Sequence, residues 1–225
     1  MRASELYYEE LGGNFDAFMS EYDVVTRGAI VRQYVDQAPS RGTCLEVGCG
    51  TGAITEWFHE LVDELTVSDI SARLAEDVGE RFGVAGRAED ATELSFADEK
   101  FDLVVSSECV EHTPDPAKAV LEMLRVLKPG GHLVLTTPNR LWLPVVLLAQ
   151  KLRIRQFQGN EVFLGYGELR DLIVGDGHTV LEQIGCHAFP WQIPLAKRVL
   201  PFLDSRATAL YPYMINQALF VRKAD

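Results

Sequence analysis

A glycine-rich turn with a carboxylate just before it is the first feature of this chain that could bind a ligand. Gly48, Gly50 and Gly52 alternate, and glycine allows positive φ and leaves room for a ligand against the main chain. Glu46 precedes the first glycine, where a carboxylate repels a pyrophosphate and suits a cationic group such as an ammonium. Asp69, 19 residues after Gly50, offers acceptors to ribose hydroxyls. The predicted ligand therefore has a ribose and an amino group and lacks a pyrophosphate.

Two carboxylates and an imidazole lie close together further along the chain, at Glu108, Glu111 and His112. Side chains three and four residues apart converge if the segment forms a helical turn. Such groups serve as general bases or hold a divalent metal. Either role would draw a proton from a hydroxyl acceptor, which is a poor nucleophile while protonated because a phenol has a pKa of about 10.

Apolar patterns indicate the strands and helices that must position these groups. The runs 43–47, 65–69 and 101–106 are typical of buried strands, and residues 53–61 carry a helical pattern. Alternating strands and helices predict a parallel sheet with helices on both faces, whose ligands bind beyond the carboxyl ends of the strands. Four later elements are also expected: a helix from Pro114 to before Pro129, and strands over 131–137, 178–186 and 217–222.

Composition narrows the possible classes of protein. The chain has 225 residues, of which 47% are hydrophobic and 24% charged, as in a single globular domain. Its net charge of −12 argues against nucleic acid as a partner, because phosphate binding needs a basic surface. The cysteines show no C-x-x-C spacing, which favours reduced thiols. The polar N-terminus and the short apolar run 141–149 predict neither a signal peptide nor a membrane span, and we expect a cytoplasmic protein.

Five segments in order resemble the class I S-adenosylmethionine (SAM) dependent methyltransferases, of the small-molecule, type 11-like group. These segments are 45–52, 65–69, 88–91, 101–106 and 127–131. The resemblance implies a Rossmann-like sheet of seven strands, mostly parallel, with the last strand antiparallel and helices on both faces. It also implies that Glu46 takes the SAM amino group, Asp69 the ribose and Asp90 the adenine amine. The full implied cofactor set is Glu46, Gly48, Cys49, Gly50, Asp69, Ile70, Asp90, Ala91 and Ser106.

Glu108-x-x-Glu111-His112 also resembles the metal-binding segment of ubiquinone-biosynthesis O-methyltransferases and small-RNA 2′-O-methyltransferases. On that resemblance Glu108, Glu111 and His112 would hold Mg²⁺ against the acceptor oxygen. Those families usually supply another ligand after the fifth strand, often a histidine, and the nearest counterpart here is Asn160 or Glu161. Many metal-free relatives keep a histidine at the position of His112. Three roles therefore stay open: a metal site, catalysis by His112 and Glu111 as acid and base, or a structural turn.

The regions outside the core 40–140 are expected to contact the substrate. Residues 1–35 carry an aromatic cluster that either packs on the sheet edge or forms a lid, namely Tyr7, Tyr8, Phe15, Phe18 and Tyr22. The segments 138–166 and 187–215 follow late strands at the ligand-binding edge, and their apolar content predicts walls for a lipophilic substrate. Segment 141–157 is apolar and basic, so it either contacts a membrane surface or packs as a cap on its own protein.

The function expected from the sequence is methyl transfer from SAM to a small or lipophilic acceptor, with oxygen as the favoured atom. N- or C-methylation is the alternative within enzymes, because the core motifs identify the cofactor and not the acceptor. A non-catalytic SAM-binding module is the alternative outside enzymes. A nicotinamide enzyme is disfavoured by Glu46.

Overall fold

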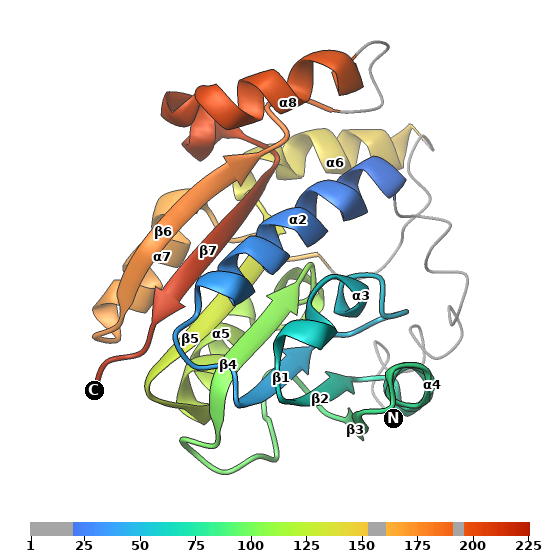
Figure 1. The fold of residues 1–225 in the computed structure, drawn as a ribbon. Coiled ribbons are helices and arrows are strands. Elements are labelled where there is room, and N and C mark those ends of the chain that lie inside the picture. The colour runs from blue at the N-terminus through green and yellow to red at the C-terminus, as the bar shows by residue number, and fades with distance from the viewer. Residues whose placement is uncertain (1–19, 153–160, 191–195) are drawn as a thin grey trace.

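One sheet organises the computed structural model, which describes residues 20–152, 161–190 and 196–225 (Figure 1). The strand order is β3-β2-β1-β4-β5-β7-β6. β7 runs antiparallel to both of its neighbours, whereas the pairs from β3 to β5 are all parallel. The predicted mostly parallel, Rossmann-like sheet is confirmed. The strands are β1 (Thr43–Val47), β2 (Glu64–Asp69), β3 (Ala85–Ala88), β4 (Phe101–Ser107), β5 (Leu127–Pro138), β6 (Thr179–Cys186) and β7 (Asn216–Arg222).

Helices cover both faces of the sheet. Buried side chains of α5 and α7 form one apolar cluster with the sheet, while those of α2, α3 and α4 contribute to a second cluster. The burial of apolar surface in these two layers is the main force that holds the sheet in place. The helices are α2 (Glu21–Gln37), α3 (Thr55–Phe58), α4 (Ala72–Phe82), α5 (Pro116–Val126), α6 (Leu143–Lys151), α7 (Tyr166–Gly175) and α8 (Ala196–Arg206), with short 3-10 turns η2 (His59–Leu61), η3 (Val110–His112), η4 (Arg140–Trp142) and η5 (Thr208–Tyr213).

Element boundaries follow local chemistry. The helix expected near Pro114 begins at Pro116 because the Asp115 carboxylate caps it, accepting a hydrogen bond from the Lys118 amide at 3.0 Å. The helix expected over 53–61 is shorter, since only Thr55–Phe58 is α-helical and the chain then tightens into η2. The late strands lie within one residue of their predicted bounds at most ends.

The two predicted insertions lie beyond the carboxyl ends of the parallel strands. η4 and α6 follow β5, and α8 and η5 follow β6; α6 and α8 lie at the same end of the molecule (Figure 1). Of the aromatic cluster, only Tyr22 falls within the described residues, on α2. Within the described part of the chain, no helix is both long and apolar enough to cross a bilayer.

Close packing of α4 against the edge strand β3 gives a test of the fold. A Cβ on Gly86 would lie 2.2 Å from the Ala75 carbonyl oxygen, so Gly86→Ala must push helix and strand apart. We expect it to lower the free energy of unfolding by at least about 2 kcal/mol in urea denaturation. Gly167→Ala on α7 is the control, because its Cβ meets no atom within 4 Å. Equal stability of the two variants would contradict this packing.

Candidate functional site

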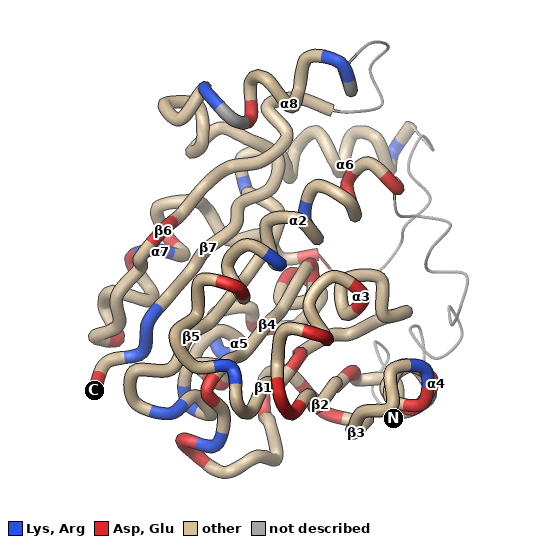
Figure 2. Tube along the Cα trace, viewed as in Figure 1, with Lys and Arg blue, Asp and Glu red and all other residues tan. Residues whose placement is uncertain are grey.

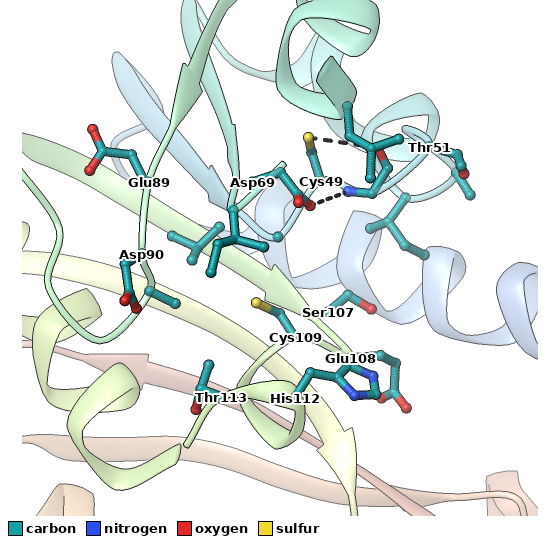
Figure 3. A pocket seen from close by; sticks show the side chains of 18 of the residues that line it. Cys49, Thr51, Asp69, Glu89, Asp90, Ser107, Glu108, Cys109, His112 and Thr113 are labelled. Atoms are coloured by element: carbon teal, nitrogen blue, oxygen red, sulfur yellow. Dashed lines mark hydrogen bonds between the residues drawn. The ribbon is translucent and has the colours of Figure 1, made fainter. Parts of the chain in front are cut away.

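A pocket opens at the carboxyl ends of β1, β2 and β4, where a parallel sheet of this kind binds its ligands. Figure 3 shows Cys49 and Asp69 on one wall, Ser107, Glu108 and His112 on the facing wall, and Glu89 and Asp90 at one end. The lining residues are Arg27, Val47, Gly48, Cys49, Gly50, Thr51, Ala53, Ile54, Asp69, Ile70, Leu74, Glu89, Asp90, Ala91, Ser107, Glu108, Cys109, His112, Thr113 and Pro114.

The glycine turn forms the floor of this pocket. Gly48 has φ +79° and Gly50 has φ +52°, which other residues rarely adopt. A Cβ on Gly48 would lie 2.4 Å from the Cys109 Sγ, so only glycine allows this approach. A Cβ on Gly50 would meet no described atom within 4 Å, so the protein leaves space there for a ligand.

Asp69 connects the turn to the end of β2. Its Oδ2 accepts a hydrogen bond from the Gly50 amide at 2.9 Å and its Oδ1 accepts one from the Ser71 amide at 3.0 Å. These bonds hold the carboxylate in the pocket wall, at the place where the sequence predicts ribose recognition. Ile70 and Leu74 add an apolar surface beside it.

The predicted adenine end is also assembled. Asp90 and Ala91 line the pocket after β3. The Asp90 Oδ1 accepts hydrogen bonds from the amide of Thr92 at 2.8 Å and from its hydroxyl at 2.7 Å. This short turn holds the segment that the resemblance assigns to adenine.

Three of the predicted site residues are not among those that line the pocket: Glu46, Ser106 and Glu111. Glu46 is buried behind the turn, where its Oε2 accepts a hydrogen bond from the Thr55 hydroxyl at 2.6 Å. Burial raises the pKa of Glu46 to about 8, and the nearby Asp69 carboxylate adds to the rise. The Ser106 hydroxyl donates to the Val47 carbonyl at 2.9 Å and so joins β4 to β1.

In the segment after β4, hydrogen bonds from other strands hold the carboxylates that were predicted to share a metal. Glu108 has φ +52°, and its two carboxylate oxygens accept hydrogen bonds from the Thr136 hydroxyl at 3.3 Å and the Asn216 amide at 2.8 Å. Glu111 is 2% exposed, and its Oε2 accepts a hydrogen bond from the Thr137 hydroxyl at 3.1 Å.

His112 lines the pocket, with its Nε2 lying 3.9 Å from the Glu111 Oε1. Within residues 20–152, 161–190 and 196–225, no group of three His, Cys, Asp or Glu side chains is placed to hold a metal ion. This arrangement gives no support to the Mg²⁺ set predicted from Glu108, Glu111 and His112, which stays a prediction. Hydrogen bonds from β5 and β7 instead tie Glu108 to Thr136 and Asn216, and one from β5 ties Glu111 to Thr137. Of the proposed further ligands, Asn160 lies outside the described residues, and Glu161 accepts a hydrogen bond from Gln150 at 2.9 Å.

Burial also raises the pKa of the two carboxyls in this segment. The pKa of Glu108 rises to about 8, with repulsion from Glu111 as the second cause and attraction to Arg27 opposing it. The pKa of Glu111 likewise rises to about 8, chiefly through burial, and its hydrogen bonds limit the rise.

Arg27 is one of the pocket residues that the sequence did not predict. It lies on α2, is 3% exposed, and lines the pocket beside Ser107. Arg27 belongs to no motif in the sequence, and its burial on α2 is visible only in the structure. His187 is fully buried, and its Nε2 lies 3.0 Å from the Asp23 Oδ1.

The strand order, the glycine turn and the carboxylate after β2 together define the class I SAM-dependent methyltransferase fold, as the sequence predicts. Residues 45–135 match a family described as a methyltransferase domain. This stretch, which is less than half of the chain, is thus similar to a methyltransferase domain.

Relatives and a solved structure agree with this class. The chain is 38% identical over 101 residues to the chloroplastic tocopherol O-methyltransferase of Arabidopsis thaliana, covering 41% of this chain and 29% of that protein. It is 41% identical over 103 residues to the ubiquinone biosynthesis O-methyltransferase of Alkalilimnicola ehrlichii, covering 43% and 41%. The chain thus spans less than half the length of these curated relatives. The N-methyltransferase NodS of Bradyrhizobium japonicum, solved with S-adenosyl-L-homocysteine (SAH), has the same fold with a TM-score of 0.70 over all of both chains, at 18% identity.

The raised pKa of Glu46 predicts a measurable pH effect. This carboxyl ionises near its ordinary pKa of 4.5 in the unfolded chain and near 8 in the fold. Between these values the folded state holds the extra proton, so stability falls as pH rises through that range. We expect Glu46→Gln to make this fall shallower, because the amide has no proton to lose. Urea denaturation at several pH values measures it.

The matched control is Glu60→Gln, the same substitution at an exposed position of η2. We expect its dependence of stability on pH to follow that of the unmodified protein. If stability falls with pH as steeply in Glu46→Gln as in the unmodified protein, Glu46 is already ionised in the fold.

Proposed function

We propose that this protein transfers the methyl group of SAM to an oxygen atom of a small or lipophilic acceptor. The observation that carries the proposal is the single pocket in which the glycine turn, Asp69 and Asp90 face the residues after β4. One half of this pocket matches the cofactor that the sequence predicts, and the other half offers polar groups to an acceptor.

The residues of the cofactor half fit SAM. The open space beside Gly50 suits the methionine part, and the carboxylates of Asp69 and Asp90 suit the ribose hydroxyls and the adenine amine. Cys49, Ile70 and Ala91 would pack against the same ligand. Glu46, directly behind the turn, would attract the ammonium group and would ionise when it binds. When bound, SAM supplies an electrophilic methyl carbon.

The acceptor half must orient an oxygen atom and take its proton. His112 lies on this wall, and we propose that its imidazole accepts the proton while Glu111, behind it, positions the ring. Lining residues such as Cys109 and Pro114 exclude water from this wall, and alignment without water is the main contribution of a protein to an in-line displacement.

The segments 138–166 and 187–215 are proposed to form the substrate walls. They follow β5 and β6 at the edge where the pocket opens. The relatives that match this chain are named for tocopherol and for ubiquinone biosynthesis, and a third is named a 2-methyl-6-phytyl-1,4-hydroquinone methyltransferase. These names support a lipophilic phenol or hydroquinone as the acceptor.

Calorimetric titration with SAH tests the cofactor half. We expect SAH to bind the unmodified protein and NAD not to bind. Asp69→Ala should weaken SAH binding by about 10-fold to 100-fold, because it removes charge-assisted hydrogen bonds of about 1.5–3 kcal/mol. Asp36→Ala on α2, at an exposed position outside the pocket, should bind SAH like the unmodified protein. Binding of NAD in place of SAH would overturn the proposal.

Transfer of radiolabelled methyl groups from SAM to 2-methyl-6-phytyl-1,4-hydroquinone then separates an enzyme from a binding module. A methyl ether is the expected product. A product methylated on a ring carbon would overturn the choice of oxygen and leave the cofactor assignment intact.

A second part of the proposal concerns a membrane surface. α6 buries none of its residues, and the apolar side chains of Leu141, Leu147, Leu148 and Leu152 are between 53% and 59% exposed. Basic residues lie in the last turns of α6 and α8 (Figure 2). An apolar helix surface bordered by lysine and arginine is suited to an anionic bilayer surface, where a lipophilic acceptor would also be found. Residues 153–157 of the predicted contact segment lie outside the described residues.

Flotation with vesicles of phosphatidylcholine and phosphatidylglycerol tests this contact. We expect the unmodified protein to float with the vesicles, and less so as salt is added. Replacing Leu147 and Leu148 by serine should lower the bound fraction several-fold, because it removes exposed apolar area. Leu181→Ser on β6 removes an equally exposed leucine away from α6 and should leave flotation unchanged. Equal loss in both variants would contradict the proposal.

A further inference from the structure

We propose that Arg27 forms an oxyanion site for the acceptor, so that this protein selects acceptors that react as a phenolate, enolate or carboxylate over amines. This inference rests on the proposed function and deepens it, because it concerns the atom that is methylated. Arg27 is the one permanently charged cation among the residues that line the described pocket.

Arg27 is held in one orientation by its neighbours. Its Nε and Nη2 donate to the Asp23 Oδ2 at 3.0 and 2.7 Å, and its Nη1 donates to the Ser107 Oγ at 2.8 Å. Each terminal nitrogen of a guanidinium carries two N–H groups, so these bonds use one on each. The proposal assigns the second N–H on each terminal nitrogen to the acceptor, because the Arg27 side chain lines the pocket.

The position of Arg27 places these donors at the acceptor end. Ser107, its partner, is the last residue of β4 and lies on the wall with Glu108 and His112, opposite Asp69 (Figure 3). A group bound here is therefore separated from the ribose and adenine residues and close to the imidazole that is proposed to take a proton.

Asp23 positions Arg27 because it is fixed from its other side. Its Oδ1 lies 3.0 Å from the Nε2 of His187, a fully buried residue with φ +62°. The His187 amide in turn donates to the Asp204 Oδ2 at 3.0 Å. Burial alone would raise the pKa of Asp23, but the hydrogen bonds from His187 and Arg27 outweigh it and lower the pKa. An ionised, doubly anchored Asp23 therefore holds the guanidinium in one orientation at the pocket wall.

The guanidinium of Arg27 itself, and not the acidic groups around it, favours oxygen over nitrogen. Arg27 faces Asp23 from its own helix and Glu108 from the end of β4. Both oxygens of Glu108 already accept hydrogen bonds from Thr136 and Asn216, which direct that carboxylate toward β5 and β7. A guanidinium donates and cannot accept a hydrogen bond, so it repels an ammonium, offers nothing to an amine N–H, and stabilises a developing oxyanion.

The reaction then balances with the groups present. The acceptor O–H gives its proton to His112, and its oxygen forms a bond to the methyl carbon. The electron pair of the broken carbon–sulfur bond stays on sulfur. Arg27 donates hydrogen bonds to the oxygen as it gains negative charge and exchanges no proton.

Visible absorbance of bound 4-nitrophenol tests the inference without turnover, because its phenolate absorbs visible light and its neutral form does not. With protein saturated with SAH, we expect the pKa of the bound phenol to fall by one unit or more, as an opposite charge within about 4–6 Å lowers a pKa by about 1–3 units. Arg27→Gln should abolish the shift and Arg27→Lys should retain part of it. The isosteric amine 4-nitroaniline should bind at least about 10-fold more weakly.

Arg32→Gln is the matched control, because Arg32 lies on the same helix but is exposed and donates to the Trp57 carbonyl outside the pocket. It should keep the full shift. Any one of four results would overturn the oxyanion site. The pKa of the bound phenol is unshifted or raised, the aniline binds as tightly as the phenol, the phenol does not bind, or Arg27→Gln keeps the full pKa shift. If Arg27→Gln does not fold, the pKa shifts measured in the unmodified protein and in Arg27→Lys test the oxyanion site. SAH binding is measured first, and its failure would overturn the proposed function and this inference with it.

Discussion

Hydrogen bonds between the turn after β1 and the end of β2 are the constraint on which the site depends. The amides of Gly48 and Cys49 both donate to the Ser68 carbonyl, at 2.8 and 2.9 Å, and the Gly50 amide donates to Asp69. The backbone can make these bonds only with positive φ at the glycines. They join the predicted ribose carboxylate to the predicted methionine-binding turn, so the two halves of the cofactor site are held together.

This arrangement buries several ionisable groups at one edge of the sheet. Burial disfavours the charged forms of Glu46, Glu108 and Glu111, and each is stabilised only in part by neighbouring hydroxyl or amide donors. Groups of this kind cost stability in the free protein and become useful when a cationic ligand or a reacting proton arrives. The raised pKa values therefore agree with a site whose electrostatics are completed by its ligands.

Much of the cofactor half could be predicted from the sequence because its signals are local. The strand over Thr43–Val47 ends at its predicted residue, and Asp69 ends its strand as expected. The acceptor half was harder to predict. Spacing placed Glu108, Glu111 and His112 on one turn, but it could not show that Glu108 adopts φ +52° or that its partner Asn216 lies 108 residues away. Those contacts tie each carboxylate to its own hydrogen-bond partners, and the structure gives the predicted metal site no support.

The sequence by itself determined the fold class, the glycine turn and the carboxylates around it, since hydrophobic periodicity and glycine conformation act over a few residues. Only the tertiary structure decided which polar groups meet at the acceptor wall. Arg27 and Ser107 are 80 residues apart and come together because α2 packs across β4 and β5. The exposure of the apolar α6 was equally a tertiary outcome, because the same leucines would be core residues if another element covered them. Pairing between distant segments is set by the packing of whole elements, and a local pattern does not record it.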